Sequence, residues 1–151
     1  MLEINNSNVP AVGELTLEKL QYLVEHSLQT LVVEQHTIVG FCVTFAPTAP
    51  YDSPNYQWFC NRYEQFVYLD RIAFVSEAQG KGLGKLLYQH IERLMLGTGL
   101  VHPLCCEVKL EPPNLGSLRF HQSIGFTEVG RLAPTPDKQV CLLMKEIPFM
   151  S

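Results

Sequence analysis

The stretch Leu69-Asp-Arg-Ile-Ala-Phe-Val-Ser-Glu-Ala-Gln-Gly-Lys-Gly-Leu-Gly84 carries the strongest structural signal in the sequence. An apolar strand runs into a short polar turn, and three glycines follow where a helix must begin: Gly80, Gly82 and Gly84. The first turn of a helix has unpaired backbone N–H groups and a partial positive charge. Glycine lets a phosphate approach that backbone closely, and Lys81 and Lys85 add full charges. The stretch therefore predicts a seat for a phosphate or pyrophosphate.

Three glycine-rich phosphate seats can be compared with this stretch. A P-loop needs a Ser or Thr after Gly-Lys and a glycine five residues before that Gly, but Leu86 and Gln79 stand there. The dinucleotide fingerprint Gly-x-Gly-x-x-Gly does not match, because Lys85 stands at the position of its third glycine. The pattern Gln/Arg-x-x-Gly-x-Gly/Ala is matched in full by residues 79–84. A tight strand-to-helix turn without a ligand is the alternative interpretation.

The matched pattern resembles the acyl-CoA pyrophosphate loop of the GNAT superfamily of N-acyltransferases. A second motif, Asn114-Leu-Gly-Ser-Leu-Arg-Phe-His-Gln-Ser-Ile-Gly-Phe126, resembles the later signature of that family. The resemblance covers residues 66–147 well and the N-terminal third loosely. Two departures are visible: Gln79 stands where Arg is commoner, and His121 stands where many members have Tyr.

The resemblance implies a fold and a cofactor. The expected fold is α+β, a mixed and mostly antiparallel twisted sheet with helices on both faces and a splay beside its central strand, and residues 1–151 would form a single acetyltransferase domain. The cofactor would be acetyl-CoA, its pantetheine arm lying along the central strand. The residues implied to bind it are Ile72, Ala73, Phe74, Gln79, Gly80, Lys81, Gly82, Leu83, Gly84, Lys85, Asn114 and Ser117. Asn114 could equally be only a helix cap, and Ser117 only an exposed helical residue.

The composition is that of a globular domain. The chain has 151 residues, 46% hydrophobic and 17% charged, with a net charge of -4. The acidic balance argues against a nucleic-acid partner, and no apolar run reaches the ~20 residues of a membrane span. The N-terminal residues do not resemble a signal peptide, so we expect a cytoplasmic protein. Its five cysteines lack metal-ligand spacing, so we expect reduced core thiols and no metal.

Periodicity and turn residues predict the remaining elements. Thr16 should cap a helix, and strands are expected at residues 29–34, 37–45, 66–75, 104–110, 126–130 and 139–147. Helices are expected at residues 55–63, after the glycines as far as residue 97, and from Asn114 to Gly125. The element order is taken as β-α-β-β-loop-β-α-β-α-β-β, the order that GNAT proteins show.

Three side chains are candidates for proton transfer. His121 occupies the position from which the family directs a Tyr hydroxyl at the sulfur of CoA, so it is a candidate general acid. It could instead serve in packing. Glu107 lies in the middle of an apolar strand and is the first candidate for general base; its alternative is an ion pair or solvated face with Lys109. Asp70 is the rival base, and its alternative is a salt bridge to an arginine such as Arg62 or Arg71.

The irregular segment at residues 47–62 is a candidate acceptor loop because it combines aromatic rings with an acid. Its candidate substrate-binding residues are Tyr51, Asp52, Tyr56 and Trp58. The same residues would also suit a small loop core or a dimer contact.

The sequence thus predicts an acetyl-CoA-dependent N-acetyltransferase that acts on a small primary amine by direct attack in a ternary complex. A homodimer is expected from the family resemblance. Two other functions remain open. One is acetylation of a protein or peptide, although the crowded loop favours a closed pocket. The other is a non-catalytic acyl-CoA sensor, which the replacement of Tyr by His121 permits.

Overall fold

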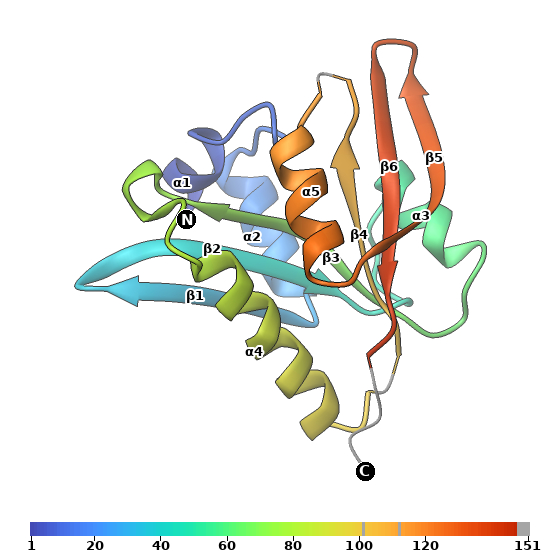
Figure 1. Cartoon of the computed structure of the whole chain (residues 1–151), viewed down its shortest axis with the longest axis horizontal. Coiled ribbons are helices and arrows are strands. Elements are labelled where there is room, and N and C mark those ends of the chain that lie inside the picture. The colour runs from blue at the N-terminus through green and yellow to red at the C-terminus, as the bar shows by residue number, and fades with distance from the viewer. Residues whose placement is uncertain (101, 112, 148–151) are drawn as a thin grey trace.

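The computed structural model describes residues 1–100, 102–111 and 113–147. A six-stranded sheet with the strand order β1-β2-β3-β4-β6-β5 forms its frame (Figure 1). The strands are β1 (Gln29–Gln35), β2 (Thr37–Phe45), β3 (Val67–Phe74), β4 (Leu104–Lys109), β5 (Thr127–Thr135) and β6 (Lys138–Lys145). The β3–β4 pair is parallel and the other pairs are antiparallel. The expected mixed, mostly antiparallel sheet is confirmed.

Helices cover both faces of the sheet. They are α1 (Leu2–Asn6), α2 (Leu17–His26), α3 (Pro54–Cys60), the short 3-10 helix η1 (Ser76–Ala78), α4 (Leu83–Gly97) and α5 (Leu115–Ser123). Helices α1, α2 and α3 pack on one face around Phe41 and form what we call the first core. Helices α4 and α5 cover the opposite face, where Leu87 and Ile91 belong to the second core. Because both faces are covered, residues 39–45 of β2 are buried without alternation.

Several boundaries differ from the sequence prediction. The strand expected ahead of the first long helix is replaced by α1, whose Ile4 joins the first core. Helix α3 is shorter than expected at its C-terminal end. Strand β5 runs on through Pro134 to Thr135, which is possible because β5 is an edge strand where proline leaves no ladder bond unmade. No described helix combines the length and the apolar character that crossing a bilayer requires.

A β-bulge in β3 determines how the site is built. Val43 of β2 pairs with Arg71, whereas the next residue, Thr44, pairs with Leu69, so Asp70 has no partner. The alternation of side chains changes phase here, because Tyr68 and Ala73 both face the first core although they are five residues apart. Bulges redirect side chains in this way. Because of the bulge, the side chains of Asp70 and Arg71 lie on the same side of the sheet.

The splay lies immediately beside the bulge. Strands β3 and β4 are paired at Val67–Leu104 and Tyr68–Cys105, and the described pairing stops there. Beyond Tyr68 the two strands separate and leave an opening at the centre of the sheet. The expected splay beside the central strand is therefore present.

Candidate active site

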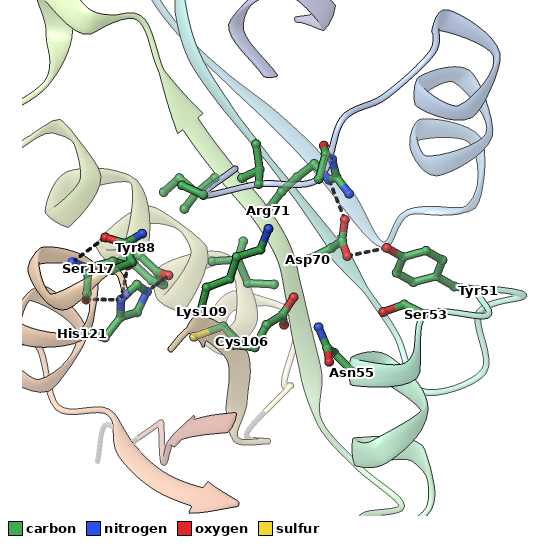
Figure 2. A pocket seen from close by; sticks show the side chains of 17 residues that line it. Tyr51, Ser53, Asn55, Asp70, Arg71, Tyr88, Cys106, Lys109, Ser117 and His121 are labelled. Atoms are coloured by element: carbon green, nitrogen blue, oxygen red, sulfur yellow. Dashed lines mark hydrogen bonds and ion pairs between the residues drawn. The ribbon is translucent and has the colours of Figure 1, made fainter. Parts of the chain in front are cut away.

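A cavity of about 340 Å³ lies in this opening (Figure 2). Its walls come from β3, β4, the start of α3 and the segment before it, residues 11–13, and the facing parts of α4 and α5. The sequence-predicted residues that line it are Tyr51, Asp70, Ile72, Glu107, Asn114, Ser117 and His121. The fold thus brings together all three candidates for proton transfer.

Glu107 projects from β4 into the cavity, on the same face as Lys109. The hydroxyl of Tyr68 donates a hydrogen bond to its carboxylate. Burial raises the pKa of Glu107 to about 8, and the neighbouring Asp70 carboxylate adds to this effect, while hydrogen bonds from Tyr68 and Asn55 oppose it. A carboxyl group that titrates close to neutral pH is suited to accept a proton from an amine.

The raised pKa of Glu107 predicts a pH-dependent loss of stability. The folded state retains the Glu107 proton up to about pH 8, whereas an unfolded chain releases it near pH 4.3. The folded state therefore binds the extra proton, and its stability falls as the pH rises through this window. Glutamine carries no such proton.

We expect Glu107→Gln to melt close to the wild type near pH 4.5 and several degrees higher at pH 8.5, since each unit of pKa difference corresponds to ~1.4 kcal/mol. Differential scanning calorimetry across this range checks the prediction. Glu34→Gln is the matched control, because Glu34 is an exposed strand residue. A difference in melting temperature between wild type and Glu107→Gln that stays the same from pH 4.5 to pH 8.5 would contradict the prediction.

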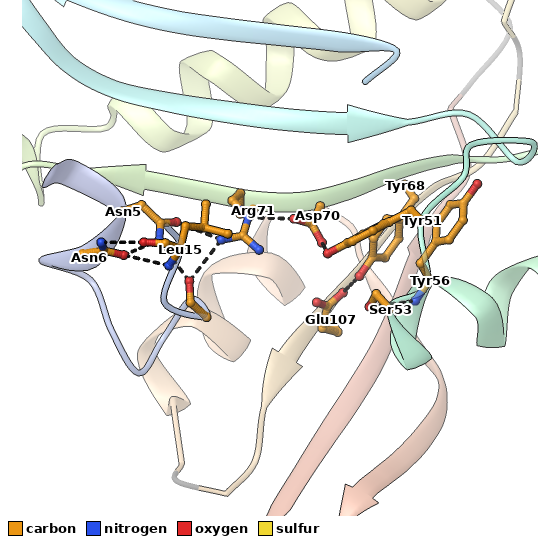
Figure 3. Close-up of polar contacts among 11 residues, drawn as sticks. Asn5, Asn6, Leu15, Tyr51, Ser53, Tyr56, Tyr68, Asp70, Arg71 and Glu107 are labelled. Atoms are coloured by element: carbon orange, nitrogen blue, oxygen red, sulfur yellow. Dashed lines mark hydrogen bonds and ion pairs between the residues drawn. The ribbon is translucent and has the colours of Figure 1, made fainter. Parts of the chain in front are cut away.

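Asp70 is held on both of its oxygens. The hydroxyl of Tyr51 donates to Oδ1 at 2.6 Å, and Nε of Arg71 lies 2.7 Å from Oδ2 (Figure 3). Both partners of the ion pair are nearly inaccessible, with side chains 3% and 9% exposed. The salt bridge considered as the alternative role of Asp70 is therefore formed, and it leaves this carboxylate less free than Glu107 to receive a proton.

The N-terminal segment closes one side of the cavity. Arg71 donates from Nη1 to Oδ1 of Asn5 at 2.9 Å and to the carbonyl of Gly13 at 3.1 Å. Asn6 donates from Nδ2 to the carbonyl of Leu15 and accepts from its N–H, each at 2.9 Å (Figure 3). These contacts hold the segment between α1 and α2 against the bulge of β3, so residues 11–13 form a fixed wall.

His121 of α5 is buried and hydrogen-bonded on both ring nitrogens. Its Nδ1 lies 2.7 Å from the carbonyl oxygen of Ser117, which can only accept, so Nδ1 carries a proton. Its Nε2 lies 2.5 Å from the hydroxyl of Tyr88 (Figure 2). Burial lowers the pKa of His121, so the ring is neutral and its Nε2 accepts the Tyr88 proton. The donor group of this pair is the Tyr88 hydroxyl from α4, which also lines the cavity.

The glycine loop has the geometry that a pyrophosphate seat requires. Gly80 and Gly82 have φ angles of 74° and 78°, and a Cβ built on either would meet no atom within 4 Å. Gly82 is the N-cap of α4. Within the described residues, no acceptor receives a hydrogen bond from the N–H groups of residues 80–85. Lys81 and Lys85 are exposed beside these N–H groups. The loop therefore fits a diphosphate.

The other residues implied to bind the cofactor lie around this loop. Gln79 donates to the carbonyl of Phe74 at 3.1 Å and to Asn8 at 3.3 Å, so its side chain links the loop to β3 and the N-terminal segment. One edge of residues 72–74 pairs with β2, whereas β4 does not pair with their other edge. Asn114 caps α5 by accepting from the N–H of Ser117 at 3.4 Å, and both residues line the cavity.

The predicted acceptor loop is only partly at the cavity. Tyr51 lines it, whereas Asp52 faces other surface hollows. Tyr56 is fully buried in the first core, where its hydroxyl donates to the carbonyl of Ala46. Trp58 packs over Gly130, whose built Cβ would lie 2.4 Å from the indole, and Arg62 covers its ring at 4.0 Å. These contacts match the alternative interpretation of a small loop core.

Some cavity residues were not among the sequence candidates: Ser53, Asn55, Arg71, Tyr88 and Lys109. Arg71 and Lys109 appeared only as salt-bridge partners, and Tyr88 is one of several buried residues on α4. Ser53 is the N-cap of α3, and a Ser before Pro-Asn-Tyr could have signalled that role. Their common position depends on the bulge and the splay, which bring distant segments together.

Comparison with known proteins assigns the class. The chain belongs to the acetyltransferase (GNAT) family, whose sequence pattern matches residues 3–126, so the protein is an acetyltransferase of the acetyl-CoA-dependent kind. No curated protein sequence matched it.

Solved structures show the same fold at low sequence identity. Ard1 from Thermoplasma volcanium superimposes with a TM-score of 0.75 at 13% identity, covering 98% of this chain and 89% of that one. Naa20 from Chaetomium thermophilum, solved with a bisubstrate analogue, gives 0.73 at 18% identity over 98% and 81%. The ribosomal-protein-S18-alanine N-acetyltransferase from Escherichia coli gives 0.69 at 16% over 99% and 87%.

Proposed function

We propose that this protein, working as one domain, transfers the acetyl group of acetyl-CoA to the primary amine of a small acceptor bound in the cavity, by direct attack in a ternary complex. The observation that carries the proposal is the position of Glu107. Its carboxyl faces the cavity in the splay, and its pKa of about 8 fits proton transfer from an amine. A free amine with a pKa near 10.4 is neutral in only about one molecule in a few thousand at pH 7, so a base in this place is useful.

Acetyl-CoA supplies the acetyl group as a thioester. The N–H groups of residues 80–85, with Lys81 and Lys85, would hold its diphosphate, and the open edge of β3 at residues 72–74 would hold the amides of its arm. The carbonyl of Phe74 already accepts from Asn8 and Gln79, so it contributes less than its neighbours. Asn114 and Ser117 would border the cofactor from α5.

Direct attack requires that no residue of the protein carries the acetyl group. Cys106 is the cysteine at the cavity, and burial raises its pKa well above the usual value, so its thiol stays protonated. A protonated, buried thiol is a poor nucleophile.

The Tyr88–His121 pair is proposed to supply the proton that the reaction needs on the cofactor side. Burial raises the pKa of Tyr88, so its hydroxyl holds the proton, which it donates to Nε2 of neutral His121 in the structure. This O–H would turn from His121 to the CoA sulfur as the thioester breaks. His121 itself would act as the acid only after taking up a second proton, which its burial disfavours.

This assignment predicts different effects for the two residues. Tyr88→Phe removes the donor and should lower kcat about 100-fold, the lower end of the usual range for a general acid. His121→Gln keeps an acceptor for Tyr88 and should lower kcat less than tenfold. Stopped-flow measurement of CoA release with each variant, alongside their affinity for CoA, checks this. A larger loss in His121→Gln than in Tyr88→Phe, at unchanged CoA affinity, would return the role of acid to His121.

The proposed function is tested by assaying CoA release against a panel of amines, amino acids and N-terminal peptides, with mass spectrometry of the products. Acetylation of a small amine supports the proposal. Acetylation of peptides alone would favour the peptide alternative, and CoA binding without any turnover would favour the sensor. The fixed wall at residues 11–13 favours a small acceptor. A cytoplasmic location and a homodimer stay predictions.

A further inference from the structure

The cavity holds charges of both signs, and they are not all neutralised by one another. Asp70 and Arg71 form an ion pair and are held further by Tyr51, Asn5 and Gly13. This pair is a fixed part of the wall. The carboxyl and ammonium side chains that line the cavity from β4 are Glu107 and Lys109.

Lys109 is a cation without an anionic partner. Its ammonium donates to the carbonyl of Pro10, which leaves two of its three N–H donors unused by that bond. No ion pair joins it to a carboxylate in the part of the chain that the structure describes. Burial and the nearby Lys138 lower its pKa, with only Glu107 opposing them. A half-buried ammonium of this kind is stabilised by an anion that enters the cavity.

Glu107 and Lys109 stand two residues apart on the same face of β4. Successive residues of one strand face are about 6.5 Å apart along the backbone. A proton acceptor and a cation are therefore presented side by side, at a spacing that a molecule with an amino group and a carboxylate a few bonds apart can bridge. Figure 2 shows Lys109 in the middle of the cavity, between the side of Asp70 and Asn55 and the side of His121.

We propose that the acceptor is a small amino carboxylate, an amino acid or a close relative, whose amino group faces Glu107 and whose carboxylate binds Lys109. This inference rests on the proposed function and deepens it by naming the class of acceptor. A diamine or polyamine is disfavoured, because its second ammonium would meet the ammonium of Lys109. In the reaction the C–N bond forms as the C–S bond breaks, the amino group loses a proton to Glu107, and the CoA sulfur takes a proton from the Tyr88 hydroxyl and leaves as the thiol.

The test uses matched acceptors. Each common amino acid is assayed against its amide and its decarboxylated amine, together with the diamine putrescine, and kcat/KM is measured for each. For the preferred side chain we expect the amino acid to exceed the amide and the amine about 10- to 100-fold, as expected for a charge-assisted hydrogen bond. Equal or better turnover of the amide, amine or diamine would overturn the inference and leave the proposed function standing.

Variants of Lys109 give a second measurement. Lys109→Gln should raise KM for the amino acid about tenfold or more, leave the decarboxylated amine unaffected, and keep the affinity for CoA. Lys109→Arg should restore most of the loss. Lys19→Gln removes an exposed lysine on α2 that does not line the cavity and should change nothing. An equal effect of Lys109→Gln on both acceptors would contradict a role in binding the carboxylate.

Calorimetric titration of the same amino acids into the CoA-bound protein separates binding from transfer. Binding that is lost in Lys109→Gln supports the assigned site even without turnover, and in that case the proposed transfer would be the part that fails. Turnover restricted to peptides would overturn both.

Discussion

Replacing Glu107 with glutamine should lower kcat/KM about 100- to 1,000-fold, within the usual range for loss of a general base. The side chain keeps its size and can still accept from Tyr68, so the cavity should persist. Wild-type activity should rise with pH up to about 8, because only the ionised carboxyl can take a proton and its pKa lies there. At pH 7 only about one Glu107 in ten is ionised. The activity of the glutamine variant should not show this rise with pH.

Asp70→Asn is the comparison that distinguishes the two candidate bases. Asp70 pairs with a buried arginine, so removing its charge leaves Arg71 uncompensated and should destabilise the protein by about 3–5 kcal/mol. Glu107→Gln should instead stabilise the protein above neutral pH. Steady-state pH profiles of both variants, with unfolding curves at each pH, measure the difference. If the rise in activity toward pH 8 is lost in Asp70→Asn and kept in Glu107→Gln, Asp70 is the base.

The parts of the fold that the sequence predicts well are those set by local patterns. The glycine cluster predicts the region where α4 begins, which the structure places at Leu83, and the branched apolar run predicts β2 with its observed bounds. Asn114 caps α5 as a residue of its type should. In each case the signal lies within a few residues of the feature that it specifies, so no knowledge of distant contacts is needed.

The bulge at Asp70 cannot be predicted from local sequence patterns. An apolar strand with one charged pair looks the same whether its side chains alternate regularly or change phase, because the extra residue is defined by the register with β2. The consequence is large, since the bulge determines which way Asp70 and Arg71 point. The N-terminal wall depends on the same register, because Arg71 holds it through Asn5 and Gly13.

Side-chain pairing across the core is the second kind of feature that the sequence does not reveal. Tyr88 and His121 are 33 residues apart and meet because α4 and α5 cover the same face of the sheet. Tyr56 and Trp58 have the composition of an acceptor loop, yet α3 turns them toward Phe66 and Gly130. Aromatic residues bury a large apolar area, so packing competes with ligand binding wherever a hydrophobic core lies within reach.

Replacing Gly82 with valine should weaken CoA binding about 100-fold. Gly82 has a φ of 78°, a conformation that costs a residue with a Cβ roughly 1–2 kcal/mol and a branched residue more. The protein itself leaves room for a side chain here, since no atom lies within 4 Å of a built Cβ. Loss of affinity would therefore reflect the displaced N–H groups or a side chain in the path of the diphosphate. Isothermal titration with CoA measures it.

Two further variants separate these causes. Gly82→Asn places a side chain on a residue that tolerates positive φ, so it tests obstruction with little strain. Gly97→Ala changes a glycine at the far end of the same helix, where a Cβ also meets nothing, and should leave the affinity for CoA unchanged. Weak binding by both Gly82→Val and Gly82→Asn would show that the diphosphate passes over this Cα. Wild-type affinity in Gly82→Val would mean that the first turn of α4 does not hold the cofactor. The role of the cavity would then have to be explained without a cofactor site at this turn.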